Sequence, residues 1–218
     1  MTSRERLEAL EKWLYENACR GKQLKAPAED GDIAQATYQE PRVFVGYPPQ
    51  RADETGFYVD ADPENVAPCI ILMPGLMQAK NQEENRFDTY RNVHRPKALG
   101  QSEAYSILLM VYEPGVRLPG FQAAAEQGEG YTKYLAEGTR EGLFTLLDWK
   151  DEIIRGLLGA KGIPGSDLIT DEENIQFTPY TEGGYIADKR PYYMGILDVV
   201  FYGYADEGRT RAVEGLLL

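Results

Sequence analysis

Histidine is a frequent catalytic and metal-binding residue, and this sequence contains only one, His94. A multi-histidine metal site within one chain is therefore impossible, because such a site needs several imidazole ligands. A Cys-His or Ser-His pair would have to use His94, which lies in a polar stretch beside Arg91, Arg95 and Lys97. A nucleophile needs a base that is held rigidly, and a mobile polar stretch is a poor scaffold for that. We therefore interpret His94 as a surface residue of a contact loop.

The glycine-rich loops that bind phosphates are absent from the sequence. Gly-x-x-x-x-Gly-Lys-Ser/Thr does not occur, and neither does Gly-x-Gly-x-x-Gly. Gly128-Glu129-Gly130 begins the second pattern, but Lys133 stands where its last glycine belongs and no strand is expected before it. The Gly-x-Ser-x-Gly motif of hydrolases is missing as well. The sequence thus predicts no catalytic residues, no cofactor and no enzymatic activity.

Carboxylates are plentiful and could in principle bind a cation. Asp171-Glu172-Glu173 is one cluster, and Asp60 with Asp62 and Glu64 is another. Neither reproduces the twelve-residue calcium loop, and charged runs in turns are usually solvated surface, so we predict no metal site. A hydrolase that uses two carboxylates remains open as an alternative, because such acids can come from distant positions.

Positive side chains gather in one polar stretch, residues 76–104, which we call the arm. So long a polar connection within a compact domain is usually a functional excursion or a mobile element. Its cations and interleaved aromatic side chains could contact a phosphate backbone or an acidic protein face, or could pair with the protein's own acidic surface. These side chains are Arg86, Phe87, Tyr90, Arg91, His94, Arg95 and Lys97.

Two other stretches are candidate contact surfaces. Arg190, Pro191 and Tyr192 open a strand-like run, either as a plain strand start, where proline costs no ladder hydrogen bond, or as an aromatic surface at a sheet edge. The chain closes on Leu216, Leu217 and Leu218, which would be a liability if exposed in a monomer. We expect these leucines to pack either on the core or on a neighbouring subunit.

Composition narrows the classes of function. The 218 residues include 35 acidic and 23 basic side chains, which give a net charge of −12 and argue against a general nucleic-acid binder. The 43% hydrophobic content is that of a globular chain, and the 15 tyrosines suit surfaces that become buried on assembly. Cys19 and Cys69 are expected to be buried thiols in a reducing compartment. No signal peptide and no membrane span are visible, which predicts a protein made in the cytoplasm.

The periodicity of the apolar residues predicts an α+β fold in a single domain, residues 1–218. We expect a mixed or antiparallel central sheet, packed by an N-terminal helix at 4–19 and a second amphipathic helix at about 142–159, with long polar loop insertions. Ser3 is the expected N-cap of the first helix, without a full capping box. The expected core strands are about 68–73, 105–112 and 191–203, with 175–177 as an edge strand. Residues 42–47 and 56–59 are expected to be short strands that form a hairpin added to the main sheet. Residues 113–141 are expected to form an irregular lead into the second helix.

The order of these elements resembles the tail terminator (tail completion, or neck) proteins of tailed bacteriophages and related contractile particles. The matching segments are Ile107 to Glu113, Leu143 to Leu158 and Pro191 to Phe201, with weaker support from the N-terminal helix. Together they cover about half of the chain. Residues 22–67 and 113–141 have no assigned counterpart.

The resemblance implies a virion protein that is assembled in the host bacterial cytoplasm. It implies a homo-oligomeric ring, a hexamer, that caps the tail tube, stops its polymerisation and joins it to the head–tail connector protein. DNA would pass through the lumen without specific binding, and the −12 charge leads us to expect an acidic lumen. Three alternatives stay open: another neck or minor tail protein with the same core, a small-ligand-binding or hydrolytic α+β domain, and a monomeric adaptor that uses the arm.

Overall fold

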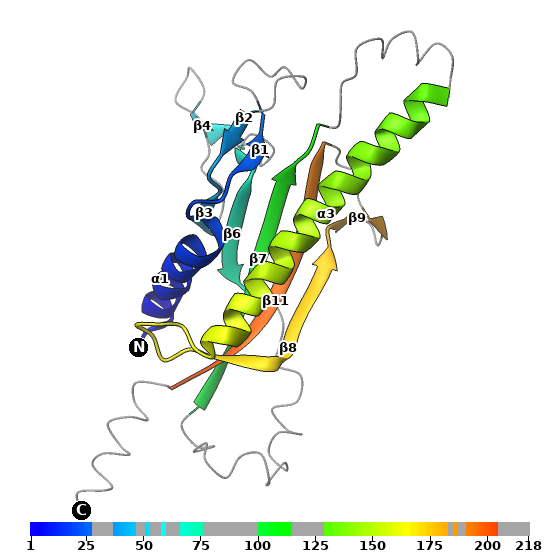
Figure 1. Ribbon diagram of the computed structural model, residues 1–218. Coiled ribbons are helices and arrows are strands. Elements are labelled where there is room, and N and C mark those ends of the chain that lie inside the picture. Colours follow the sequence, from blue (N-terminus) through cyan, green and yellow to red (C-terminus); the bar gives the residue numbers. More distant parts are fainter. Residues whose placement is uncertain are drawn as a thin grey trace, which may run out of the picture.

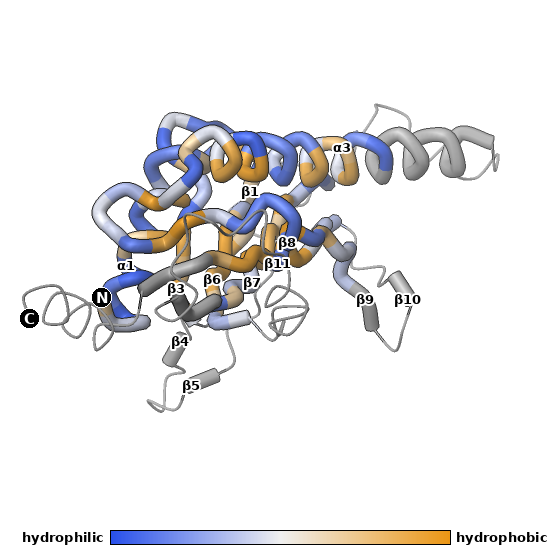
Figure 2. The backbone as a smooth tube through the Cα atoms, turned by 90° about the horizontal axis from the view of Figure 1, so that it is seen from below, coloured by the Kyte–Doolittle hydropathy of each residue, from blue (hydrophilic) through white to orange (hydrophobic). Residues whose placement is uncertain are grey.

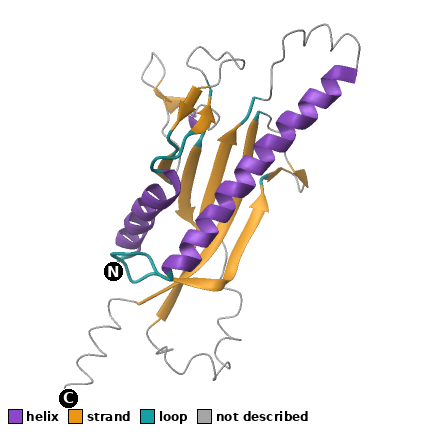
Figure 3. Cartoon of the chain, in the orientation of Figure 1, coloured by secondary structure: helices purple, strands orange, loops and turns teal. Residues whose placement is uncertain are grey.

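The computed structural model shows an α+β fold in which two helices pack on one mixed β-sheet (Figures 1 and 3). The structure describes residues 1–27, 37–46, 51–52, 58–59, 66–75, 100–114, 129–182, 185–186 and 191–204. The helical elements are α1 (Ser3–Leu14), a π-helical turn η1 (Tyr15–Cys19) and α3 (Glu129–Ala160). The strands are β1 (Leu24–Ala26), β2 (Thr37–Gln39), β3 (Arg42–Val45), β4 (Arg51–Ala52), β5 (Tyr58–Val59), β6 (Cys69–Pro74), β7 (Gly100–Tyr112), β8 (Ile169–Pro179), β9 (Thr181–Glu182), β10 (Tyr185–Ile186) and β11 (Tyr192–Tyr204).

The main sheet has five strands in the order β3-β6-β7-β11-β8. β3 runs parallel to β6, and the other three pairings are antiparallel. The long strands β7 and β11 pair along their whole length, from Tyr192 opposite Tyr112 to Tyr204 opposite Gly100. β3 and β8 are therefore the two edges of this sheet, and β8 forms the right-hand edge in Figure 1.

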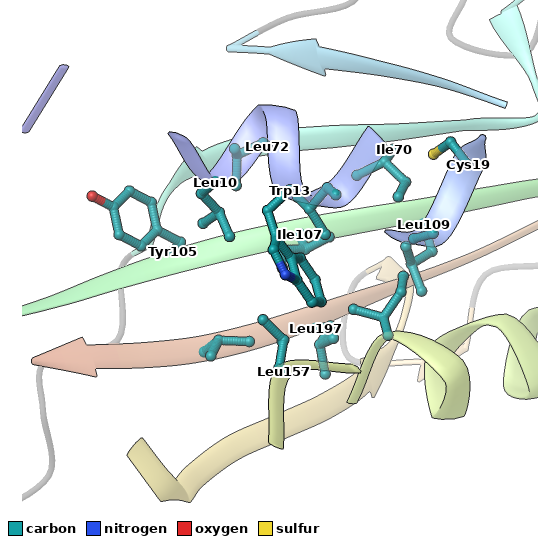
Figure 4. Packing of buried hydrophobic residues seen from close by; sticks show 14 of the residues in the cluster. Leu10, Trp13, Cys19, Ile70, Leu72, Tyr105, Ile107, Leu109, Leu157 and Leu197 are labelled. Carbon is teal, nitrogen blue, oxygen red and sulfur yellow. The ribbon is translucent and has the colours of Figure 1, made fainter. Parts of the chain in front are cut away.

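Both helices cover the same face of the sheet, which we call the helix face (Figure 2). Alternate residues of β6, β7 and β11 point toward the helices, as the period of two along a strand requires. Figure 4 shows how Leu10 and Trp13 of α1 meet Ile70, Ile107 and Leu197 of the sheet. All five lie in the buried core, where the packing of apolar side chains supplies most of the stabilisation of the fold.

Helix α3 is longer than predicted and faces the core along a slightly different stripe. It begins at Glu129 rather than near residue 142, so the second half of the stretch expected to be irregular is helical. The buried positions are Leu146, Trp149, Ile153 and Leu157, whereas Leu143 is 43% exposed. The leucine and isoleucine spacing predicts a stripe that includes Leu143 and is broken at Lys150, and it leaves out Trp149, which is among the largest fully buried side chains.

The N-terminal helix starts with a full capping box, contrary to the prediction from the sequence. Thr2, not Ser3, is the N-cap, and its hydroxyl accepts a hydrogen bond from the Glu5 amide while the Glu5 carboxylate accepts one from the Thr2 amide. Thr2 and Glu5 have the spacing of the capping-box motif. The prediction was wrong because it took Ser3 as the N-cap, and the residue three positions after Ser3 is Arg6. The helix ends in η1, where the Arg20 amide donates to the Tyr15 carbonyl five residues earlier.

The core strands were predicted correctly, with differences in pairing and length. The strands expected at 68–73 and 105–112 are indeed neighbours, but β7 starts at Gly100, so the last five residues assigned to the arm belong to the sheet. The strand at 42–47 does not form a hairpin with 56–59. β3 instead pairs in parallel with β6, and β5 pairs with β4. The edge strand expected at 175–177 is the centre of β8.

Candidate functional site

Most of the residues predicted to form an interface lie outside the described part of the chain. They are Arg86, Tyr90, Arg91, His94, Arg95, Lys97, Arg190, Leu216, Leu217 and Leu218. Of the predicted set, the structure places Tyr192 alone, so the role of the arm and of the C-terminal leucines stays a prediction.

Tyr192 pairs with Tyr112 of β7, and the pairing of β8 with β11 begins further along, at Gly195. It begins β11, which lies between β7 and β8, and its ring centroid is 5.2 Å from that of Tyr112 on the face away from the helices. The next residue, Tyr193, points to the helix face and packs against Gly142 of α3. The segment is a strand start, as one of the two interpretations predicts, and its role as an aromatic contact surface stays a prediction.

The acidic run from Asp171 to Glu173 is part of β8 rather than a solvated turn. Asp171 is buried, and its Oδ1 accepts a hydrogen bond from the Glu173 amide at 3.2 Å while its Oδ2 accepts one from the Asn174 side chain at 2.7 Å. The carboxylate thus stabilises an irregularity of the strand, where the register with β11 shifts between Val199 and Phe201. Within the described residues, no group of three His, Cys, Asp or Glu side chains could hold a metal ion.

The strongest cluster of charges surrounds Arg6 of α1, which is 2% exposed. Its guanidinium donates two hydrogen bonds of 2.9 Å to the carboxylate of Asp167 and one of 2.6 Å to Glu103 of β7. The hydroxyls of Ser3 and Tyr105 also donate to Glu103. The Arg6 cluster therefore joins the N-terminal helix to β7 and to the loop that follows α3.

The electrostatics of the Arg6 cluster are those of a structural ion pair. The bond to Asp167 and the attraction of both carboxylates raise the pKa of Arg6 against the opposing effect of burial. Burial alone would raise the pKa of Glu103, but hydrogen bonds from Tyr105, Ser3 and Arg6 outweigh it and hold that pKa below its usual range. Groups held fully charged at neutral pH are poor general acids or bases, which need a pKa near the working pH. The cluster therefore holds α1 to β7 and to the loop after α3 by buried, charge-assisted hydrogen bonds.

A second polar pair lies on the opposite face of the sheet. Ser106 of β7 donates a short hydrogen bond to Asp198, which lies directly across from it on β11. Met73 of β6 lies opposite Ser106, and Gln176 of β8 lies opposite Asp198, so that the four residues form one row across the sheet. Ser106 and Asp198 are thus each other's hydrogen-bond partners within the sheet.

The two cysteines are free and buried, as predicted. Cys19 lies on the helix face and Cys69 belongs to the cluster on the other face. Burial raises the pKa of each thiol to about 12. Neither thiol is therefore suited to nucleophilic or redox chemistry, which requires a thiolate.

The feature with the clearest capacity for binding is the edge of β8. The Tyr180 amide donates to the Met194 carbonyl, which fixes residues 176, 178 and 180 as those whose main-chain groups point toward β11. The N–H and C=O of Ile175 and Phe177 therefore point away from the sheet. In the described part of the chain no strand pairs with this side of β8 beyond a bridge between Gly162 and Ile169.

β3, at the opposite edge of the sheet, also directs main-chain N–H and C=O groups away from the sheet, over fewer residues than β8. The Gly46 amide donates to the Leu72 carbonyl, so the even-numbered residues point toward β6 and the main-chain groups of Val43 and Val45 point outward. Val45 is 39% exposed. Unpaired strand edges are templates for pairing with another chain, and natural proteins usually guard them.

A flank of α3 continues the apolar surface at the β8 edge. The Lys150 ammonium lies 5.5 Å from the centre of the Phe177 ring, so this side of the helix faces β8. Leu143 lies two turns before Lys150 and thus on the same side, and it is 43% exposed. Phe144 is equally exposed but points further outward, with the Arg140 guanidinium 5.0 Å from its ring centre. The sequence did not predict these edges, because the pattern of apolar residues indicates which segments are strands but not which strand lies at the edge of the sheet.

Comparisons with models of protein families, with curated proteins and with solved structures find no match for this chain. No helix in the described part of the chain is long and apolar enough to cross a membrane.

Proposed function

We propose that the protein is a structural subunit of a homo-oligomeric ring of the tail terminator type. In this proposal the ring caps the tail tube of a phage or phage-like particle and joins it to the head–tail connector. The subunit has no enzymatic role, and DNA passes through the lumen without specific binding.

The observation that carries the proposal is a five-stranded sheet whose two unlike edges, β3 and β8, have no partner strand within the described residues, with both helices on one face. A ring needs head-to-tail contacts between unlike patches, and β3 and β8 offer two such patches at opposite ends of one rigid element. The element order also supports the proposal, since it is the order that led to the resemblance with tail terminators. The polar clusters of the described residues favour an assembly role over catalysis, because their groups are used in internal hydrogen bonds.

Another neck or minor tail protein with the same core would share these features, so the test must address the tube itself. The purified chain is added to polymerising tail tube protein, and tube lengths are measured by negative-stain electron microscopy. We expect tubes that stop growing and carry a ring at one end. Tubes that grow to the same length with and without the chain would contradict a terminator role.

Deletion of residues 80–98 tests the predicted part of the arm in the same assay. If the arm contacts a neighbour or the tube, the deleted chain keeps its circular dichroism spectrum and loses capping. A deletion that keeps full capping would exclude the arm from the interface and favour the edges of the sheet alone. A cryo-EM map of the ring tests the acidic lumen, and a basic lumen would contradict that part of the proposal.

A further inference from the structure

We propose that the β8 edge of one subunit pairs with the β3 edge of the next, in antiparallel orientation, with Ile175 opposite Val45 and Phe177 opposite Val43. The inference rests on the proposed ring function, and it specifies which surfaces of two copies meet. It follows from the directions in which the main-chain groups of the two edges point.

The part of β8 that can accept another strand is short and well bounded. Ile175 and Phe177 direct their amides and carbonyls outward, as the register with β11 requires. On one side of them the Glu173 amide already donates to the Asp171 carboxylate. On the other side Pro179 occupies the next outward position, where it has no N–H to offer. A pairing strand therefore meets two residues with outward donors and acceptors.

The β3 edge matches this length. Val43 and Val45 direct their amides and carbonyls outward, and the preceding outward position is Pro41. When Val45 lies opposite Ile175 and Val43 opposite Phe177, the two prolines Pro41 and Pro179 come to lie opposite each other. The ladder then ends at the same point on both strands, and no amide is left without a partner there.

The side chains also agree with this register. Ile175, Phe177 and Val43 all pack toward the helix-face core, and Val45, two residues from Val43, points to that face as well. Paired residues place their side chains on the same face of a sheet, so the joined sheets keep both helix layers on one side. β3 and β8 run in opposite directions within one subunit, and a rotation about an axis along the strands preserves those directions. A ring closed in this way pairs them antiparallel.

Disulfide trapping tests the register directly. In the antiparallel pairing Arg42 lies opposite Thr178 at a position without main-chain hydrogen bonds, where the two Cα atoms are about 4.5 Å apart and a disulfide can form. Neither side chain belongs to the buried core. The double variant R42C/T178C, oxidised in its oligomeric state, should give a ladder of cross-linked species on a non-reducing gel. R42C/Q176C is the control, because it shifts one partner by two residues to about 7–8 Å.

Each outcome bears on a different claim. A ladder from R42C/T178C that is strong relative to R42C/Q176C supports the proposed register. A cross-linked dimer from the single variant T178C, with no ladder, would show that two β8 edges pair with each other and would overturn the proposal. An oligomer by native mass spectrometry with no cross-link would also overturn it while leaving the ring function intact. Absence of any oligomer, alone or with tube, would overturn both.

Discussion

The indole Nε1 of Trp149 donates a buried hydrogen bond of 2.8 Å to the main-chain carbonyl of Ala18. Ala18 lies in η1, at the C-terminal end of the first helix, where the last carbonyls have no partner within the helix. One side chain of α3 thus satisfies the end of the N-terminal helix and fills the space between the two helices. This contact fixes the helix layer that lies over the sheet.

Trp149→Phe should therefore lower the free energy of unfolding by more than the loss of ring volume alone would, because the hydrogen bond to Ala18 is lost as well. The variant leaves the Ala18 carbonyl buried without a donor and opens a small cavity, for an expected loss of about 2–4 kcal/mol in the free energy of unfolding. Urea unfolding followed by circular dichroism measures it. Phe144→Leu, on the exposed side of the same helix, should change the free energy by less than about 0.5 kcal/mol. A loss below 1 kcal/mol for Trp149→Phe would mean that the hydrogen bond contributes little.

Substitution by alanine should change the stability of the protein in opposite directions at Gly142 and at Gly159 of α3. A Cβ at position 142 would overlap the ring of Tyr193, whereas one at position 159 meets nothing within 4 Å. Gly159→Ala should stabilise the helix by about 0.5–1 kcal/mol, because glycine costs backbone entropy there. Gly142→Ala should cost about 1–3 kcal/mol, because the Tyr193 ring must move within a packed layer. Thermal melts of the two variants check the sign, and stabilisation by Gly142→Ala would contradict the close contact of α3 with β11.

The stability supplied by Glu103 should depend on pH. Its folded pKa is lowered, so its contribution is fully present above the unfolded value of about 4.3 and is lost as the pH falls through the folded pKa. The difference in the free energy of unfolding between the wild type and Glu103→Gln should therefore be large at pH 7 and shrink toward pH 3. Glu8→Gln removes an exposed carboxylate paired with Arg4 and should show little difference at either pH. A Glu103→Gln difference that stays constant from pH 7 to pH 3 would argue against a charged role in the Arg6 cluster.

Both thiols should be unreactive in the folded protein. With each pKa raised to about 12 by burial, roughly one thiol in ten thousand is ionised at pH 8, and neither sulfur is accessible to a reagent. A thiol-specific colorimetric reagent should give no signal in native buffer and two equivalents in 6 M guanidinium chloride. One equivalent of fast reaction in native buffer would show that η1 or β6 opens readily.

The sequence allowed the core elements to be predicted because apolar residues repeat with a clear period. β6, residues 107–112 of β7 and most of β11 consist of β-branched, aromatic and aliphatic residues, and α1 carries leucines at helical spacing. The partner of β3 could not be predicted in the same way. A parallel pairing joins residues distant in sequence, and the strand pattern does not reveal it.

The candidate contact surfaces also differ in whether the sequence predicts them. The arm was found by its composition, and its residues lie outside the described part of the chain. The sheet edges were not found, because they depend on which strand comes last and on which amides point outward. Pro41 and Pro179 were the available signals, since a proline within a strand favours an edge position, but a proline alone does not say what the edge meets.

The most direct test of the central claim is native mass spectrometry of the purified chain over a concentration series, alone and with tail tube protein. We expect a hexamer, or a monomer that becomes a hexamer when tube is present, with no dimer accumulating because the two edges are unlike. A stable monomer or dimer that does not respond to the tube at any concentration would contradict the ring, and the search would then turn to ligands.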